Sequence, residues 1–182
     1  MRPHYEAIGR VASAAVANGD TIVNSYDIPS NEQGHLGLHI EHRETTFRVN
    51  ADPGAQYLNV VLAARLTNRE DIDPETLPPA PEARRALFNG TGIEDFDGTI
   101  RVLEYTPDGN GDTHFDGIRI VRPLYAYDPD FSFRRYRELV TDIIPRLNNG
   151  FSIVSDELDI EFSDEQSIPS DEEDRPSGPS FY

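Results

Sequence analysis

The sequence predicts an α+β fold in which helices pack on one face of an antiparallel sheet. Two observations indicate it. An amphipathic helical pattern lies at each end of the chain, and between these ends apolar and polar residues alternate in short segments separated by turn residues. The length of 182 residues suits one domain, which we assign to residues 1–162. Residues 163–182 are acidic and rich in Ser and Pro, so we expect a tail that is disordered on its own.

The opening segment, residues 3–18, has apolar residues at helical spacing and ends in an Asn-Gly stop signal. We predict an N-terminal helix there. Residues 21–28 favour a short strand or an extended arm, which Pro29 ends. The apolar positions of the helix are Tyr5, Ile8, Ala12, Ala15 and Val16.

An antiparallel meander of three strands is predicted over residues 35–42, 45–49 and 57–66, because apolar and polar side chains alternate in each. The turn signals Arg43-Glu44 and Asp52-Pro53-Gly54 join the strands. This alternation makes one face of the meander apolar, so we expect one buried face.

The middle of the chain contains a Pro-rich, acidic connection over residues 67–81. It is long for a compact domain, so we predict a mobile arm or a binding loop. A short helix is expected over residues 82–89. A β-hairpin follows, with strands at 98–105 and 115–122 and a Gly/Asp-rich turn at 108–112.

The long C-terminal helix has the strongest pattern, and we predict it over residues 132–147 with Ser132 as its N-cap. Pro145 is expected to kink the helix or to end it early. Residues 151–162 alternate apolar and acidic side chains, which predicts one more strand. The apolar stripe of the helix comprises Tyr136, Leu139, Val140, Ile143 and Leu147.

The charge of the chain is strongly acidic, and its basic residues are all arginine. There are 33 Asp and Glu against 16 Arg and no Lys, which gives a net charge of −17; average usage would give very roughly ten lysines. At about 1 M ionic strength the Debye length is about 3 Å, so crowded surface carboxylates repel each other little and keep the protein hydrated. We interpret this composition as an adaptation to the cytoplasm of an extreme halophile, a haloarchaeon or a virus that replicates in one, rather than as chance in an ordinary acidic protein.

Several classes of protein are disfavoured by composition. The chain has no Cys, which excludes disulfides and thiolate metal sites. It has no apolar run near the roughly 20 residues of a membrane span, and its N-terminus lacks the apolar core of a signal peptide. The net charge of −17 argues against a nucleic-acid partner. We therefore expect a cytoplasmic protein, or a virion protein if it is viral, without a membrane partner.

The order of predicted elements is helix, three-stranded meander, short helix, hairpin and long helix. Over residues 3–148 this order resembles the type III secretion chaperone-like fold, which the YbjN-like proteins share. The resemblance implies a small, cytoplasmic, dimeric protein that binds unfolded or extended segments of partner proteins and that has no catalytic activity. The departures are the extra segment 20–29, the predicted strand 151–162 and the tail.

The histidine cluster of the chain is formed by His35, His39 and His42. In a strand, residues four apart are separated by about 13 Å, too far to share one ion. We therefore predict solvent-facing histidines, with His42 on the face opposite to the other two. A metal-dependent hydrolase that uses His35, His39 and Glu41 is the third of three functional hypotheses.

Two acidic segments are candidates for chemistry that we interpret as structural. Residues 108–112 resemble the start of an EF-hand loop, but Thr113 stands where Gly is needed and Arg119 where the bidentate Glu belongs, so a hairpin turn is predicted. Residues 94–97 place carboxylates close together, which in so acidic a chain carries little information. We predict no catalytic residue, no cofactor and no metal site.

Two features are candidates for protein binding. The basic residues Arg134, Arg135 and Arg137 stand out in an acidic chain, and they form either a solvated helix face that pairs with Glu138 or a docking patch for an acidic partner or the tail. Phe181 and Tyr182 end the tail as a candidate aromatic anchor. The leading hypothesis is a non-enzymatic, chaperone-like protein-binding module that forms a homo-oligomer. The alternative is a structural virion component, a head–tail connector or tail-end protein.

Overall fold

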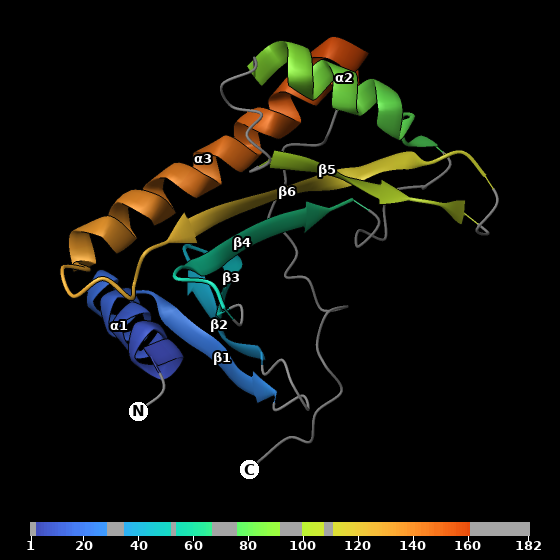
Figure 1. The fold of residues 1–182 in the computed structure, drawn as a ribbon. Coiled ribbons are helices and arrows are strands. Elements are labelled where there is room, and N and C mark those ends of the chain that lie inside the picture. Colours follow the sequence, from blue (N-terminus) through green and yellow to red (C-terminus); the bar gives the residue numbers. More distant parts are fainter. Residues whose placement is uncertain are drawn as a thin grey trace.

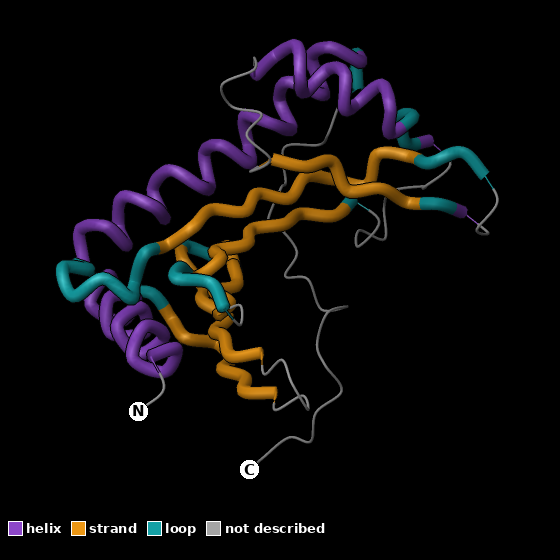
Figure 2. The backbone as a smooth tube through the Cα atoms, in the orientation of Figure 1, coloured by secondary structure: helices purple, strands orange, loops and turns teal. Residues whose placement is uncertain are grey.

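The computed structural model describes residues 3–28, 35–51, 54–66, 76–91, 100–107 and 111–160. Within them, three helices pack against a six-stranded antiparallel sheet with the strand order β1-β2-β3-β4-β6-β5, which confirms the predicted α+β class (Figures 1 and 2). The elements are α1 (Pro3–Asn18), β1 (Thr21–Ile28), β2 (His35–His42), β3 (Thr45–Ala51), β4 (Leu58–Arg65), α2 (Ala80–Thr91), β5 (Ile100–Tyr105), β6 (His114–Leu124) and α3 (Phe133–Leu158).

The alternation of apolar and polar side chains along each strand determines which face of the sheet is buried. In β3 every second residue from Thr45 to Ala51 is buried, and the intervening residues are half-exposed. Its Val49 lies opposite Val60 of β4, so apolar side chains of neighbouring strands meet on one face. The three helices cover this face, and the core is continuous across the sheet. Its largest fully buried side chains include Tyr136, Phe47, Phe115, Ile40, Leu58 and Leu62.

The sequence predicted either a short strand or an extended arm for residues 21–28. The structure shows a strand, and it is the first strand of the sheet. Residues 21–28 form β1, which pairs antiparallel with β2 from Thr21 opposite Glu41 to Ile28 opposite His35. The register shifts between Ile22 and Asn24. The sheet therefore begins one strand earlier than the predicted meander, and β1 is one of its two edges.

The strand β6 contains a position that requires glycine. Gly117 has a φ of +149°, and a Cβ atom placed there would lie 1.9 Å from the carbonyl oxygen of Ala64 on β4. Next to it, the buried Asp116 accepts a hydrogen bond of 2.6 Å from Nη1 of Arg65. The two strands therefore approach closely at this point, and an ion pair joins them there.

The end of the connection before α2 runs along β6. The amide of Phe115 donates to the carbonyl of Pro78 at 2.7 Å, and the amide of Ala80 donates to the carbonyl of Thr113 at 2.9 Å. Part of the segment predicted as a mobile arm or binding loop therefore continues the sheet beside β6. Residues 67–75 of that segment lie outside the described residues.

The C-terminal helix α3 is longer than predicted, and the strand expected over residues 151–162 was wrong. The helix continues to Leu158 because Phe151 and Val154 extend its buried stripe. Gly150 does not end the helix; it lets α3 approach the sheet, since a Cβ there would lie 2.9 Å from Cδ1 of Ile118. Pro145 lies exposed inside the helix and does not end it.

The end of α3 has a clear stop signal. Asp159 adopts the left-handed conformation with a φ of +52°, and its amide donates to the carbonyl of Ser155. Residues 161 and 162 of the predicted strand, like the whole predicted tail, lie outside the described residues. Across the part of the chain that the structure describes, no helix combines the length and apolar character needed to cross a membrane.

Candidate functional site

An open groove of about 960 Å³ lies where the first turns of α1 and α3 meet the end of β6. We call it the tyrosine groove. Four separate parts of the chain line it: the start of α1, the loop before β4, the end of β6 with the loop after it, and the first turns of α3. The lining residues are Pro3, His4, Ala55, Gln56, Pro123, Leu124, Tyr125, Tyr127, Asp128, Arg135, Glu138 and Leu139.

Aromatic side chains form the wall of the groove on the β6 side. Tyr125 is 57% exposed, and its ring makes an edge contact with Tyr57, itself 37% exposed, at a centroid distance of 6.0 Å. The hydroxyl of Tyr127 and Nδ1 of His4 are hydrogen-bonded at 2.5 Å, and the two rings meet edge to face at 5.6 Å. These contacts fix the orientation of the rings and leave Tyr125 accessible from solvent.

The loop that carries these tyrosines is held by Arg10 of α1. Nη1 of Arg10 donates to three successive carbonyls, those of Ala126, Tyr127 and Asp128, at 3.0, 3.2 and 3.2 Å. One guanidinium thus satisfies a run of backbone acceptors that no regular element pairs. The loop is therefore tied to α1, and the groove wall is preorganised.

The charged rim of the groove is the pair formed by Arg135 and Asp128. Nη1 of Arg135 lies 3.1 Å from Oδ2 of Asp128. The amide of Asp130, which donates to this carboxylate, and the Arg135 guanidinium both lower the pKa of Asp128 below its ordinary value. Asp128 therefore keeps its charge to a lower pH than an ordinary aspartate. The half-exposed Arg135 keeps donors free to meet a ligand in the groove, since a guanidinium has five.

The three basic residues singled out from the sequence do not all line the groove. Arg135 lines the groove, whereas Arg134 and Arg137 are not among its lining residues. Arg134 is 86% exposed and pairs with Glu138 at 2.7 Å, as expected for a solvated helix face. Consecutive helical residues point about 100° apart, which explains the divergence. The candidate anchor residues Phe181 and Tyr182 lie outside the described residues.

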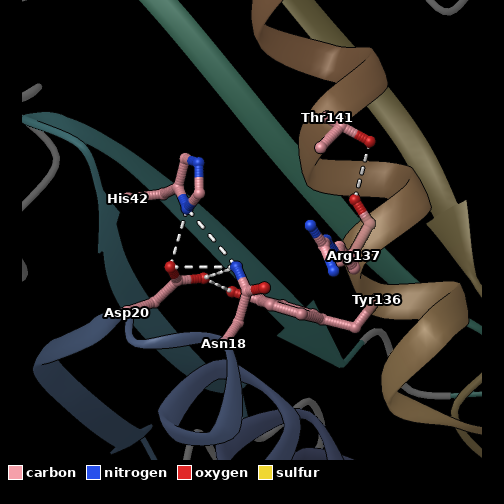
Figure 3. A network of polar contacts seen from close by, with 6 residues as sticks. All are labelled: Asn18, Asp20, His42, Tyr136, Arg137 and Thr141. Atoms are coloured by element: carbon pink, nitrogen blue, oxygen red, sulfur yellow. Dashed lines mark hydrogen bonds and ion pairs between the residues drawn. The ribbon is translucent and has the colours of Figure 1, made fainter.

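A buried polar network lies behind the groove and fixes the first turns of α3. The carboxylate of Asp20, 3% exposed, accepts 2.6 Å hydrogen bonds from the Tyr136 hydroxyl and from Nδ1 of His42. Nδ2 of Asn18 donates to both oxygens, at 3.1 and 3.2 Å. Figure 3 shows these side chains converging from the end of α1 and the turn after it, from β2 and from α3. The network joins the three elements beside the turn that carries Arg135.

The central tyrosine of this network is inaccessible to a substrate. Tyr136 has no exposed surface. Its burial and then its hydrogen bond to the Asp20 carboxylate raise the pKa of Tyr136 well above the ordinary value. The hydroxyl therefore stays protonated and donates, which is a structural task.

The histidine cluster differs from the prediction in one respect. His39 and His42 do lie on opposite faces of β2, but His42 is 13% exposed and bonded to Asp20 rather than solvent-facing. His39 packs its ring against Tyr26 at 5.4 Å, and the side chain of His35 is outside the described part. Among the described residues, no group of three or more His, Cys, Asp or Glu is placed to hold a metal ion. Residues 94–97 and 108–110 are outside that part.

Sequence reasoning missed His4, Tyr125 and Tyr127. His4 and Tyr127 are 123 residues apart in the chain and meet only after folding. The one local signal was Tyr125-Ala126-Tyr127, two aromatic residues directly after the predicted hairpin. Comparisons with family models, with curated proteins and with solved structures found no match to this chain.

Proposed function

We propose that this chain is a non-enzymatic, chaperone-like protein-binding module, and that the tyrosine groove holds an extended segment of its partner. The observation that carries the proposal is the combination of the exposed Tyr125, the rigid Tyr127 and the half-exposed Arg135 in one groove. Tyr and Arg are the residues most enriched where protein interfaces gain their binding energy. Aromatic rings that are fixed before binding also lose little entropy on binding.

The edges of the sheet support the same proposal. β1 and β5 each pair with a single neighbour in the described sheet, so each has an outer row of backbone donors and acceptors. An extended peptide can add to such a row as a further strand. The same chemistry allows a second copy of this chain to pair, which is the basis for proposing a homo-oligomer. The type III secretion chaperone-like resemblance and a halophilic cytoplasm belong to the same proposal.

A photocrosslinking experiment tests the groove. A photoreactive amino acid replaces Gln56, which is exposed in the groove, and in a control protein it replaces Arg85, which is exposed on α2. Both proteins are irradiated in a haloarchaeal lysate at about 2–3 M KCl, a concentration that screens long-range charge effects. We expect discrete adducts from position 56 that weaken in a Tyr125→Ala background. No adduct at position 56, or the same adducts from both positions, would contradict the proposal.

The oligomeric state is tested separately. Size-exclusion chromatography with light scattering in the same salt is expected to give a mass that is a small multiple of the chain mass of 20.4 kDa. A strict monomer across the concentration range would remove the homo-oligomer and leave the groove to be judged by the crosslinking result.

A further inference from the structure

The face of the sheet that the helices leave uncovered carries four arginines, one on each of four neighbouring strands. We call it the arginine face: Arg48 on β3, Arg65 on β4, Arg119 on β6 and Arg101 on β5. Each arginine directly precedes or follows a buried core residue in its strand, for example Arg119 between Ile118 and Ile120, so its side chain points away from the helices.

Within the described strands, two of these four arginines, Arg101 and Arg119, form no ion pair. Asp116 already binds Arg65, and the other carboxylate on this face is Glu41 of β2. Arg101 and Arg119 are directly opposite each other across β5 and β6, an arrangement of like charges that destabilises a sheet unless an anion lies between them. Within the described part of the chain, Nε of Arg119 is the buried side-chain polar atom without a hydrogen-bond partner.

The arginines surround a small apolar centre. Val61 of β4 and Val121 of β6 lie in one row with Arg48 of β3; Val121 is partly exposed, whereas Val61 is buried at 3% exposure. Leu103 lies two residues after Arg101 and on the same face of β5. The matching ligand is an extended, acidic peptide with widely spaced apolar residues.

The chain itself contains such a segment. Residues 161–182 carry seven acidic residues and one Arg, with Phe162, Ile168, Phe181 and Tyr182 spaced among them. Fully extended, these 22 residues can span up to about 70 Å, whereas the distance across the sheet from β5 to β3 is about 14 Å, three strand spacings. The segment is therefore long enough to cross the arginine face.

The described chain also ends near the edge of the sheet formed by β5, the edge nearest to Arg101 and Arg119. The last turns of α3 lie beside α2, on the β5 side (Figure 1), and Phe151 of α3 contacts Phe115 of β6 at a centroid distance of 6.0 Å. Phe115 is opposite Glu104 of β5. A segment that leaves α3 here meets the β5 edge first, and Arg101 and Arg119 lie just inside that edge.

We infer that the acidic C-terminal segment, residues 161–182, folds back over the arginine face of its own molecule and pairs its carboxylates with Arg101 and Arg119. Arginine binds carboxylates through two parallel hydrogen bonds, and such contact pairs persist when molar salt screens longer-range forces. This inference uses other residues than the tyrosine groove, so either proposal can fail without the other.

Spin labels on the full chain test this inference, because the absence of native Cys makes each introduced Cys unique. One label replaces Ser170. The second replaces Thr46, which is on the arginine face, or Thr141, which is exposed on α3. Electron–electron distance measurements in molar KCl are expected to give a short, narrow distribution for the pair with position 46 and a longer one for the pair with position 141.

Two variants decide whether charge holds the segment. D171N/E172Q/E173Q/D174N neutralises the segment and is expected to broaden the distribution to position 46. E6Q/E44Q/E82Q/D130N changes the net charge equally at exposed positions elsewhere and is expected to leave it narrow. Broad distributions in the unaltered chain, or equal responses to both variants, would overturn the inference. A dipolar signal between copies that carry one label each would instead assign the face to a second molecule and overturn it as well.

Discussion

At the scale of single residues, the buried carboxylate of Asp20 determines how the start of α3 is held. This carboxylate accepts hydrogen bonds from three side chains, those of Tyr136, His42 and Asn18. Each donor compensates part of the free-energy cost of removing the charge from water. Removing one donor leaves a buried acceptor with fewer bonds. The effect of each partner can therefore be measured by single substitutions.

Tyr136→Phe removes the hydroxyl that donates to Asp20 and keeps the aromatic ring in the core. We expect the free energy of unfolding to fall by about 1–3 kcal/mol, because the carboxylate loses a partner in a buried site. Urea unfolding at constant KCl measures the change. Tyr125→Phe removes a hydroxyl from an exposed ring and is expected to change stability by less than about 0.5 kcal/mol. Equal effects of the two substitutions would contradict the role assigned to the network.

The raised pKa of Tyr136 predicts a pH dependence at the alkaline side. The folded protein keeps this hydroxyl protonated, while the unfolded chain releases the proton near pH 10. The stabilisation is therefore complete below pH 10 and is lost as pH rises further, by up to about 1.4 kcal/mol per pH unit. To test this, the free energy of unfolding is measured as a function of pH for the native chain and for Tyr136→Phe, and the two slopes are compared. The substitution should flatten the slope above pH 10, and parallel slopes would refute this.

At the scale of elements, the exposed Pro145 in the middle of α3 is a defect that the helix tolerates. Proline has no N–H to donate to the carbonyl four residues earlier, that of Thr141. The buried residues on either side of it, Ile143 and Leu147, hold the helix to the sheet in spite of this loss.

Pro145→Ala restores the missing hydrogen bond. We expect a gain of about 2–2.5 kcal/mol in unfolding free energy, because the helix-interior cost of Pro, about 3 kcal/mol, exceeds the entropic stabilisation of about 0.4–1 kcal/mol that Pro provides by restricting the unfolded chain. Asn148→Ala, also exposed on α3, is the control. It changes helix propensity alone and should contribute less than about 0.7 kcal/mol. A loss of stability in Pro145→Ala would show that the proline serves another purpose.

Elements with local patterns were predictable, and contacts between distant parts of the chain were not. The alternation in residues 35–42 and 45–49 predicted β2 with its observed bounds and β3 except for its last two residues, because the period of a half-buried strand is visible in sequence. The extension of α3 was missed because Asn149-Gly150 has the form of a helix stop. Only the proximity of Ile118 shows why glycine is needed inside the helix.

The candidate site was predictable to a smaller extent. Arg135 was identified, because a basic run is conspicuous in an acidic chain. His4 and Tyr127 are separated by 123 residues, so no local pattern could bring them together. The pairing of His42 with Asp20 likewise depends on where α1 ends relative to β2, which is a property of the packed structure.

At the scale of the whole molecule, the net charge of −17 dominates behaviour in dilute buffer. We expect the melting temperature to rise steadily from about 0.05 M to about 3 M KCl, because shortening the Debye length from about 14 Å to a few ångström removes repulsion between surface carboxylates. Differential scanning calorimetry gives the midpoint. The E6Q/E44Q/E82Q/D130N variant carries four fewer negative charges and should depend less on salt. A midpoint that does not change with KCl would contradict the halophilic interpretation.

The helix α3 gives the molecule a fixed internal length. Its 26 residues extend about 39 Å at 1.5 Å per residue, with a groove residue on the first turn and the origin of the C-terminal segment at the last. The groove and the point where the described chain ends are therefore held about one helix length apart. The length of α3 sets the distance between its two ends. Adding or deleting one helical turn would change this distance by about 5.4 Å and rotate one end relative to the other very little.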